Sequence, residues 1–213
     1  MKIYEAEMKL DLLDFLLKEK SENFILASEV AINQSENLVD ILKISNLECH
    51  AYEIKSYKDN YIRLPNQIKS YTSVFDYTSV VVPKANYPKV LKELPQKIGV
   101  ITIDDDHCVK IKRKAKKIIR LNKMGLAKLL WKTELVNILQ SKLNISKKNL
   151  NIMSDVYLRE ILTKNFTLKQ LKEISYKYLL NRYKNKYLNF INNKGLYLVK
   201  EDLLELNLHN HSL

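Results

Sequence analysis

The chain has 213 residues, of which 46% are hydrophobic and 28% are charged, with only three glycines and four prolines. This composition excludes a disordered chain and a turn-dense all-β fold, and the length allows one medium domain with or without a smaller appendage. No apolar run of about 18 residues is present, so no membrane-spanning helix is expected. Cys49 and Cys108 are far apart and the N-terminus lacks the apolar core of a secretory signal, which favours a reducing cytoplasm.

The net charge of +12 is unevenly distributed along the chain. Residues 1–108 carry 13 Lys and Arg against 17 Asp and Glu, whereas residues 109–213 carry 23 against 7. A basic surface of this kind most often meets nucleic acid. Lysine outnumbers arginine 31 to 5, however, and AT-rich coding alone can produce such a composition.

The spacing of apolar residues predicts the secondary structure in chain order. Up to residue 115 we expect a helix over 4–19, strands over 24–32, 38–44 and 47–56, a helix over 65–75, a buried strand over 78–82, a short helix over 87–94, a strand over 98–103 and a small edge strand over 109–111. Beyond residue 115 we expect only helices, over 126–143, 156–162 and from the capping box Thr167-x-x-Gln170 to about 189. The order αβββαβ predicts an α+β core over residues 1–114, followed by a basic helical region over 115–213.

Two acidic residues come together if the second and third strands form a hairpin. With Asn46-Leu47 as a two-residue loop, Ser45 pairs with Glu48, and the constant index sum of antiparallel pairs puts Asp40 opposite Glu53. Lys55 shares the face of Glu53 because residues two apart on a strand point the same way. On the other face we expect Val39, Ile41 and Ile54.

Adjacent buried carboxylates are costly unless a cation joins them, and oxygen ligands suit Mg²⁺ or Mn²⁺. A neighbouring lysine can position a water molecule or balance negative charge that develops on a phosphoryl group. The competing interpretation is a surface hairpin with an ordinary Glu–Lys pair. The apolar character of both strands argues against that interpretation.

The residues Asp40 and Glu53-Ile54-Lys55, in this element order, resemble the PD-(D/E)XK nuclease superfamily. Gln67 and Tyr71, four apart on the following helix, resemble the Q-x-x-x-Y element of its RecB-like branch. The segment Glu53-Ile54-Lys55-Ser56-x-x-Asp59, with Arg63-Leu64-x-x-Gln67 and Leu129-Leu130-Trp131-Lys132-x-Glu134-Leu135, is also similar to small bacterial nuclease-like proteins of unassigned role. The resemblance covers roughly residues 1–140 and departs at Val39-Asp40, where the superfamily name has Pro-Asp.

The resemblance implies a restriction-endonuclease-like core with a mixed sheet and a metal-dependent nuclease activity, with DNA favoured over RNA. Metal ligands would be Asp40, Glu53 and the carbonyl of Ile54, and Glu29 is either an additional acid near the metal or an ordinary polar strand residue. Lys55 would position the water and Gln67 would orient Lys55 or a phosphate. Arg63 and Tyr71 would support the site.

The partners of the basic half follow from the same interpretation. We expect phosphate contacts from Lys112, Arg113, Lys116, Lys117 and Arg120. Tyrosines of the last helix, such as Tyr176 and Tyr183, could stack on bases, although such spacing favours a core role. A homodimer or larger complex stays open. The alternatives are a catalytically silent nuclease fold that binds nucleic acid or protein in defence, repair or a mobile element, and a toxin-like RNA nuclease.

Overall fold

A six-stranded mixed sheet forms the centre of the computed structural model, which describes residues 3–19, 24–32, 37–45 and 48–208. The strands lie in chain order, antiparallel from β1 to β3, parallel from β3 to β5, and antiparallel again between β5 and β6. Their bounds are β1 (Phe24–Ile32), β2 (Asn37–Ser45), β3 (Cys49–Ile54), β4 (Tyr77–Pro83), β5 (Gly99–Ile103) and β6 (Val109–Arg113). The α+β class, the mixed sheet and the αβββαβ order are therefore as predicted.

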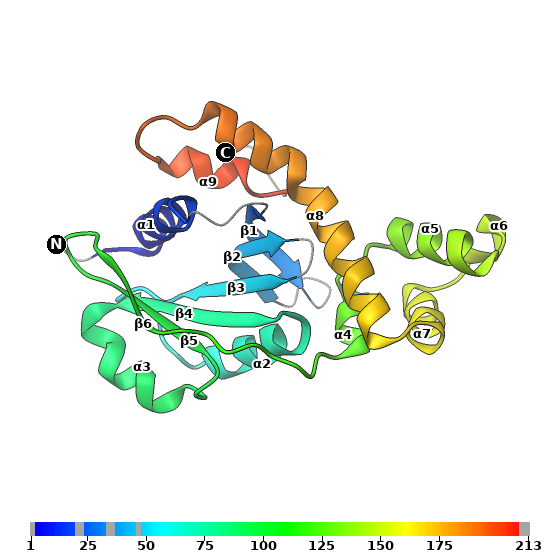
Figure 1. Ribbon diagram of the computed structural model, residues 1–213, viewed down its shortest axis with the longest axis horizontal. Coiled ribbons are helices and arrows are strands. Elements are labelled where there is room, and N and C mark those ends of the chain that lie inside the picture. The colour runs from blue at the N-terminus through cyan, green and yellow to red at the C-terminus, as the bar shows by residue number, and fades with distance from the viewer. Residues whose placement is uncertain (1–2, 20–23, 33–36, 46–47, 209–213) are drawn as a thin grey trace.

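Helices cover both faces of this sheet (Figure 1). Helix α1 (Glu5–Leu17) packs on one face, and α2 (Leu64–Val74) and α3 (Tyr87–Glu93), which follows a 3-10 turn over Lys84–Asn86, pack on the other. In β4, Val81 contacts the α1 layer while Val80 and Val82 contact the α2 and α3 layer. Burial of both faces is typical of a parallel strand and explains the β-branched run in β4.

The chain after residue 115 is helical in its described part. The helices are α4 (Lys123–Lys128), α5 (Lys132–Leu143), α6 (Lys147–Asn151), α7 (Asp155–Asn165), α8 (Leu168–Asn193) and α9 (Lys200–Glu205). Thr167 caps α8 through the predicted capping box. None of the described helices has the length and apolar character that a membrane span requires.

The prediction of one helix over 126–143 is wrong, because residues 129–131 between α4 and α5 are not helical. Trp131 starts α5, and its N–H donates to Glu134 Oε2 at 2.8 Å. Arg182 of α8 forms an ion pair with the same carboxylate and lies 4.0 Å from the centre of the Trp131 ring. These contacts come from a distant helix, so the local apolar spacing did not predict the break.

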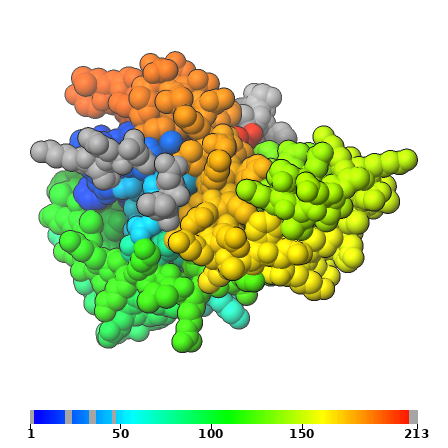
Figure 2. Space-filling model, turned by 45° about the vertical axis from the view of Figure 1, so that its right-hand side comes forward, coloured from blue at the N-terminus to red at the C-terminus, as the bar shows by residue number. Residues whose placement is uncertain are grey.

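The last helices return to the N-terminal half of the molecule. Phe190 of α8 and Leu206, which follows α9, are buried in the same cluster as α1. Ser28 of β1 donates its N–H to the Leu206 carbonyl at 3.1 Å. Helices α5–α7 form a lobe at one end of the molecule (Figure 2). Tyr176 and Tyr183 of α8 are buried, which confirms the core interpretation of these tyrosines. The boundary at residue 114 stays a prediction.

Candidate active site

Three acidic residues occupy neighbouring positions on three adjacent strands. Ile41 pairs with Tyr52 in the β2–β3 ladder, the register predicted for this hairpin, and Ser45 donates its N–H to the Glu48 carbonyl at 3.0 Å. The loop residues 46 and 47 lie outside the described residues. Continued by one residue, the register places Asp40 opposite Glu53. Likewise the β1–β2 ladder, with Ser28 opposite Ile41 and Val30 opposite Val39, places Glu29 opposite Asp40.

Glu29 has a left-handed backbone, with φ of 52°, in the middle of β1. For a residue other than glycine this conformation costs about 1–3 kcal/mol, and such residues are concentrated at functional sites. At Glu29 the side chains of β1 stop alternating regularly between the two faces of the sheet. Ala27 and Val30, three residues apart, are therefore buried in the same cluster. On β2 the corresponding shift puts Val39 in that cluster, so its predicted place beside Ile41 and Ile54 is wrong.

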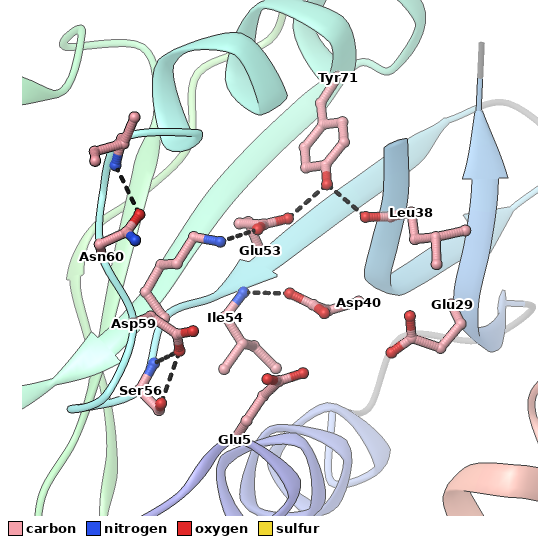
Figure 3. Close-up of polar contacts among 12 residues, drawn as sticks. Glu5, Glu29, Leu38, Asp40, Glu53, Ile54, Ser56, Asp59, Asn60 and Tyr71 are labelled. Carbon is pink, nitrogen blue, oxygen red and sulfur yellow. Dashed lines mark hydrogen bonds and ion pairs between the residues drawn. The ribbon is translucent and has the colours of Figure 1, made fainter. Parts of the chain in front are cut away.

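Asp40 and Glu53 are both held by specific donors. Asp40 Oδ2 accepts the Ile54 N–H at 2.7 Å, and Glu53 Oε1 accepts from Lys55 Nζ at 2.6 Å (Figure 3). The Lys55 N–H donates to the Val81 carbonyl at 2.9 Å, which fixes the end of β3 against β4. Because the N–H and C=O of one strand residue point to the same side, the Ile54 carbonyl is directed toward β2 as well. The predicted grouping of Asp40, Glu53, Ile54 and Lys55 is thus present.

Tyr71 of α2 holds the second oxygen of Glu53. The buried hydroxyl lies 2.5 Å from Glu53 Oε2 and 2.7 Å from the Leu38 carbonyl. A hydroxyl has one proton, so both contacts are hydrogen bonds at once only when Glu53 is protonated and donates to Tyr71. The supporting role predicted for Tyr71 therefore has a direct structural form, a hydrogen-bonded link from β2 through α2 to β3.

A second set of carboxylates meets Asp40 from the other side. Oxygen atoms of Glu5, Glu29 and Asp40 lie within 4.8 Å of one another and converge from α1, β1 and β2 (Figure 3). The ammonium of Lys9, on α1, contacts all three: it forms ion pairs with Glu5 Oε1 at 2.8 Å, with Asp40 Oδ1 at 3.2 Å and with Glu29. Glu53 is outside this trio, because its two oxygens face Lys55 and Tyr71.

The electrostatics of the site reflect burial and mutual repulsion. Burial, followed by the charge of Glu53, raises the pKa of Asp40 to about 7, although Lys9 and the Ile54 N–H oppose the rise. Burial also raises the pKa of Glu53 against the opposing effects of Lys55, Tyr71 and a hydrogen bond from Gln67. For Lys9, burial lowers the pKa, but Asp40 and Glu29 outweigh it, so the pKa lies above its usual value.

Asp40, Glu53 and Lys55 line a pocket of about 450 Å³, whose lining does not include Lys9. The pocket extends from Glu5 on α1 to Gln67 on α2, and Arg63, at the start of α2, lies on its wall. The Gln67 Oε1 atom is buried and has no hydrogen-bond partner among the residues that the structure describes. At the end of β3, Asp59 accepts from both the N–H and the hydroxyl of Ser56 at 2.7 Å, which closes the turn beside Lys55. Six of the residues predicted for the site therefore line one cavity, and Glu29 and Tyr71 are not in its lining; the six are Asp40, Glu53, Ile54, Lys55, Arg63 and Gln67.

The predicted phosphate-binding residues are distributed more widely. Lys117 and Arg120 line a groove of about 600 Å³ beside α2, together with Lys69 and Lys97, which were not predicted. Arg113 instead donates to the carbonyls of Ile98 and Pro95 at 2.8 and 3.1 Å. Neither Lys112 nor Lys116 lines this groove: Lys112 lies near the Tyr87 ring, and Lys116 is exposed elsewhere.

Sequence reasoning missed Lys9 and Glu5. The two residues are four apart, a spacing that puts them on one face of α1, but such Glu–Lys pairs occur on many solvated helices. Only the packing of α1 beside Glu29 and Asp40 distinguishes this pair from a surface ion pair.

Comparisons with known proteins give one family. The family model described as bacteriophage P4 protein cII matches residues 1–207. Protein cII of Enterobacteria phage P4 is 29% identical over 184 residues, covering 84% of this chain and 67% of the relative. Among solved structures, the SPO1766 protein of unknown function from Silicibacter pomeroyi aligns with 56% of this chain and 79% of its own, with 21% identity and a TM-score of 0.37. A likeness of that TM-score carries no argument.

Proposed function

The chain belongs to the family of the bacteriophage P4 protein cII, and from that premise we propose that it is a metal-dependent nuclease that hydrolyses phosphodiester bonds in DNA. The family description names no activity, so the proposal rests on the site. One observation carries it: Asp40, Glu53, Lys55 and Gln67 line a single pocket.

The chemistry of the pocket fits a divalent cation. When ionised, the four carboxylates that line it, Glu5, Asp40, Glu53 and Asp59, exceed the two cationic groups of Lys55 and Arg63 by two charges, the charge of one Mg²⁺ or Mn²⁺. Carboxylate and carbonyl oxygens are the ligands these ions prefer. Burial and the charge of Glu53 raise the pKa of Asp40 to about 7, and a cation bound beside it would favour the ionised form.

Asp40, Glu53 and the Ile54 carbonyl would hold the ion, and Glu29 is close enough to Asp40 to be an additional ligand. A divalent cation bound there would polarise the phosphodiester and lower the pKa of a water molecule. The chain itself supplies orientation: Tyr71 and Lys55 fix both oxygens of Glu53 before any substrate arrives. Such preorganisation is the main source of electrostatic catalysis.

Lys55 has the central role among the residues that do not bind metal. Its side chain is 12% exposed and lines the pocket, where the ammonium would stabilise negative charge on the phosphoryl oxygens in the transition state. Gln67, which lines the same pocket, would orient Lys55 or a phosphate. Arg63 would pair with a phosphate at the wall of the pocket.

The groove beside α2 would bind the flanking phosphates. Lys69, Lys97, Lys117 and Arg120 line it without any acidic residue among the lining side chains. Contacts of this kind are independent of sequence and position the substrate rather than select it. Lys117 also forms an ion pair with Glu48, so a phosphate would have to compete for this side chain.

One observation favours a second candidate, the catalytically silent nuclease fold that binds nucleic acid or protein. Lys9 already places a cation against Asp40 and Glu29, which would make a metal unnecessary for stability. The two candidates predict different effects of Mg²⁺: the ion should support cleavage and shift the melting curve of a nuclease, and it should do neither for a silent fold.

The experiment is to incubate the purified protein with plasmid, linear and single-stranded DNA and with RNA, in Mg²⁺, Mn²⁺ or EDTA. We expect cleavage of DNA with either ion and none in EDTA. Glu53→Gln and Lys55→Met should each lower the cleavage rate by about 100-fold or more, whereas Glu93→Gln, at an exposed position on α3, should cut like wild type. Equal cutting by wild type and Glu53→Gln would assign the activity to a contaminant. If no substrate is cut and Mg²⁺ does not shift the melting curve, the silent fold is the better interpretation.

A further inference from the structure

Lys9 lies at the centre of the Glu5, Glu29 and Asp40 carboxylates, where its side chain is only 9% exposed. It is the ammonium nearest to Asp40 Oδ1, because Lys55 faces Glu53 instead. A lysine is rarely buried to this extent unless it is paired, and here it has three acidic partners. These contacts give Lys9 an electrostatic role at the site, in addition to its place in α1.

We propose that Lys9 is an internal counter-cation, which neutralises Asp40 and Glu29 in the metal-free protein and gives up Asp40 when a divalent cation binds. The inference rests on the proposed metal site and adds a positioning residue to it. Asp40 Oδ2 is occupied by the Ile54 N–H, so Oδ1, the oxygen that Lys9 contacts, is the one available to an ion. The ammonium and the ion would compete for the same oxygen.

The exchange is feasible because Lys9 has two acidic partners besides Asp40. Glu5, one helical turn before Lys9, accepts its ammonium at 2.8 Å and is half-exposed, and Glu29 contacts it as well. Lys9 can therefore leave Asp40 without becoming a buried, unpaired charge, which would be strongly destabilising. The metal-free site stays compact because Lys9 limits repulsion between Asp40 and Glu29.

The first test compares Mg²⁺ and Mn²⁺ binding by calorimetry in wild type and Lys9→Met, at pH 8.5 to keep the carboxyl groups ionised. Removal of the competing charge should tighten binding by about tenfold, equivalent to about 1.4 kcal/mol. Lys18→Met is the matched control, since Lys18 lies just past the end of the same helix and its ion pair in the described part of the chain is with exposed Asp14. It should bind the ions like wild type. Unchanged or weaker binding in Lys9→Met would overturn the proposed exchange.

The second test needs no metal and no activity. In EDTA, Lys9→Met should melt lower than wild type, and Glu29→Gln should also melt lower, because each breaks the ion pair. In the Lys9→Met background, however, Glu29→Gln should raise the melting temperature, because it removes a carboxylate that has lost its cation. Additive losses would overturn the counter-cation role. If Lys9→Met does not fold, Lys9→Arg, which keeps the charge, should behave like wild type, and Glu29→Gln alone still reports the pair.

The two tests separate this inference from the proposed function. If wild type and Lys9→Met both fail to bind Mg²⁺ and Mn²⁺, the proposed metal-dependent nuclease is wrong and so is the exchange. Lys9 would still be established as the counter-cation if Glu29→Gln lowers the melting temperature of wild type in EDTA but raises that of Lys9→Met. If wild type binds the ions and cuts DNA but Glu29→Gln lowers the melting temperature in both backgrounds, the nuclease proposal stands and the role of Lys9 is refuted.

Discussion

Glu53 is 2% exposed and has a different partner at each carboxylate oxygen, Lys55 at one and Tyr71 at the other. A carboxylate buried this deeply depends on its hydrogen bonds, because each lost partner leaves a desolvated acceptor. The same Tyr71 hydroxyl also contacts the Leu38 carbonyl, so one atom supports both strands that carry the proposed ligands. The position of Glu53 is thus determined by a side chain outside the sheet.

Tyr71→Phe should therefore lower the free energy of unfolding by about 1–3 kcal/mol, since it removes the buried hydroxyl that Glu53 and the Leu38 carbonyl share as a hydrogen-bond partner. Chemical denaturation in EDTA measures this loss. Tyr57→Phe removes a hydroxyl that makes only an exposed contact with Asp105 at 3.3 Å and should change stability by less than about 0.5 kcal/mol. Equal losses in the two variants would contradict a special role for the Tyr71 hydroxyl.

The raised pKa of Asp40 predicts a pH dependence of stability in the metal-free protein. Its pKa is about 7 in the folded protein and about 3.9 when unfolded. Between these values the folded protein binds more protons than the unfolded chain, so the free energy of unfolding falls as pH rises from about 4 to about 7. Asp40→Asn should reduce this fall in denaturation curves recorded in EDTA between pH 5 and 8.

The comparison of slopes is needed because other groups titrate in the same window. The pKa of His107 is raised by its hydrogen bond to Asp11, and that contribution to stability is also lost as pH rises. Glu53, whose pKa burial raises, contributes a fall of the same sign. The effect of His107 persists in Asp40→Asn, whereas the pKa of Glu53 is raised less once the neighbouring charge is gone, so the difference between the two proteins reports Asp40 together with its interaction with Glu53. Identical slopes would show that Asp40 ionises normally.

At the scale of elements, β5 can lie close to its neighbours because it begins with glycine. A Cβ on Gly99 would come within 2.1 Å of Ser79 Oγ on β4 and 3.0 Å of the Ala115 nitrogen. Ser79 has limited freedom to move, because its hydroxyl is hydrogen-bonded to His50 Nε2 at 2.8 Å. Gly99 therefore sets the distance between the central strands and the segment that leads to the basic groove.

Gly99→Ala should lower the free energy of unfolding by about 1–3 kcal/mol through overpacking. Gly195→Ala is the control, since its new Cβ would meet only the Tyr197 carbonyl at an ordinary 3.5 Å. The double variant Ser79→Ala/Gly99→Ala should recover part of the loss, because it removes the closest obstructing atom. Thermal denaturation of the three variants checks this. If Gly99→Ala is as stable as wild type, the space around residue 99 can accommodate a Cβ.

The sequence predicted elements well where the signal was local. The register of β2 and β3, and with it the meeting of Asp40 and Glu53, followed from one hairpin. The left-handed Glu29 was not predictable, because glutamate is not among the residue types that favour that conformation. The break before Trp131 and the place of Lys9 depend on contacts with distant elements, which no local pattern contains.

At the scale of the whole molecule, the basic charge is partly used within the fold. Arg182 and Lys172 form ion pairs with Glu134 and Asp76, and Arg113 donates to backbone carbonyls, so these residues are not free to bind phosphate. The groove beside α2 is different, since its lining contains four basic side chains and no acidic one. Net charge alone therefore overstates the surface available to nucleic acid.

Replacing Lys69 and Lys97 by Glu should weaken DNA binding and lower the slope of log affinity against log salt by about 2, one for each lost phosphate contact. Lys147→Glu/Lys148→Glu is the matched control, because it changes the net charge equally at exposed positions on α6. Binding measured by fluorescence anisotropy over a salt series distinguishes the groove from a diffuse charge effect. Equal slopes for both double variants would show that the groove does not bind the phosphates of DNA.

The contact between Ser28 and Leu206 has a consequence for the timing of synthesis. Ser28 immediately precedes Glu29, yet the carbonyl that accepts its N–H belongs to a residue translated long after every strand of the sheet. Leu206 is also buried against the helix that carries Lys9. A nascent chain on the ribosome can pair β2 with β3, but it lacks this last support for the acidic cluster until α9 has emerged. The complete set of contacts around the acidic cluster therefore forms only after translation has passed residue 206.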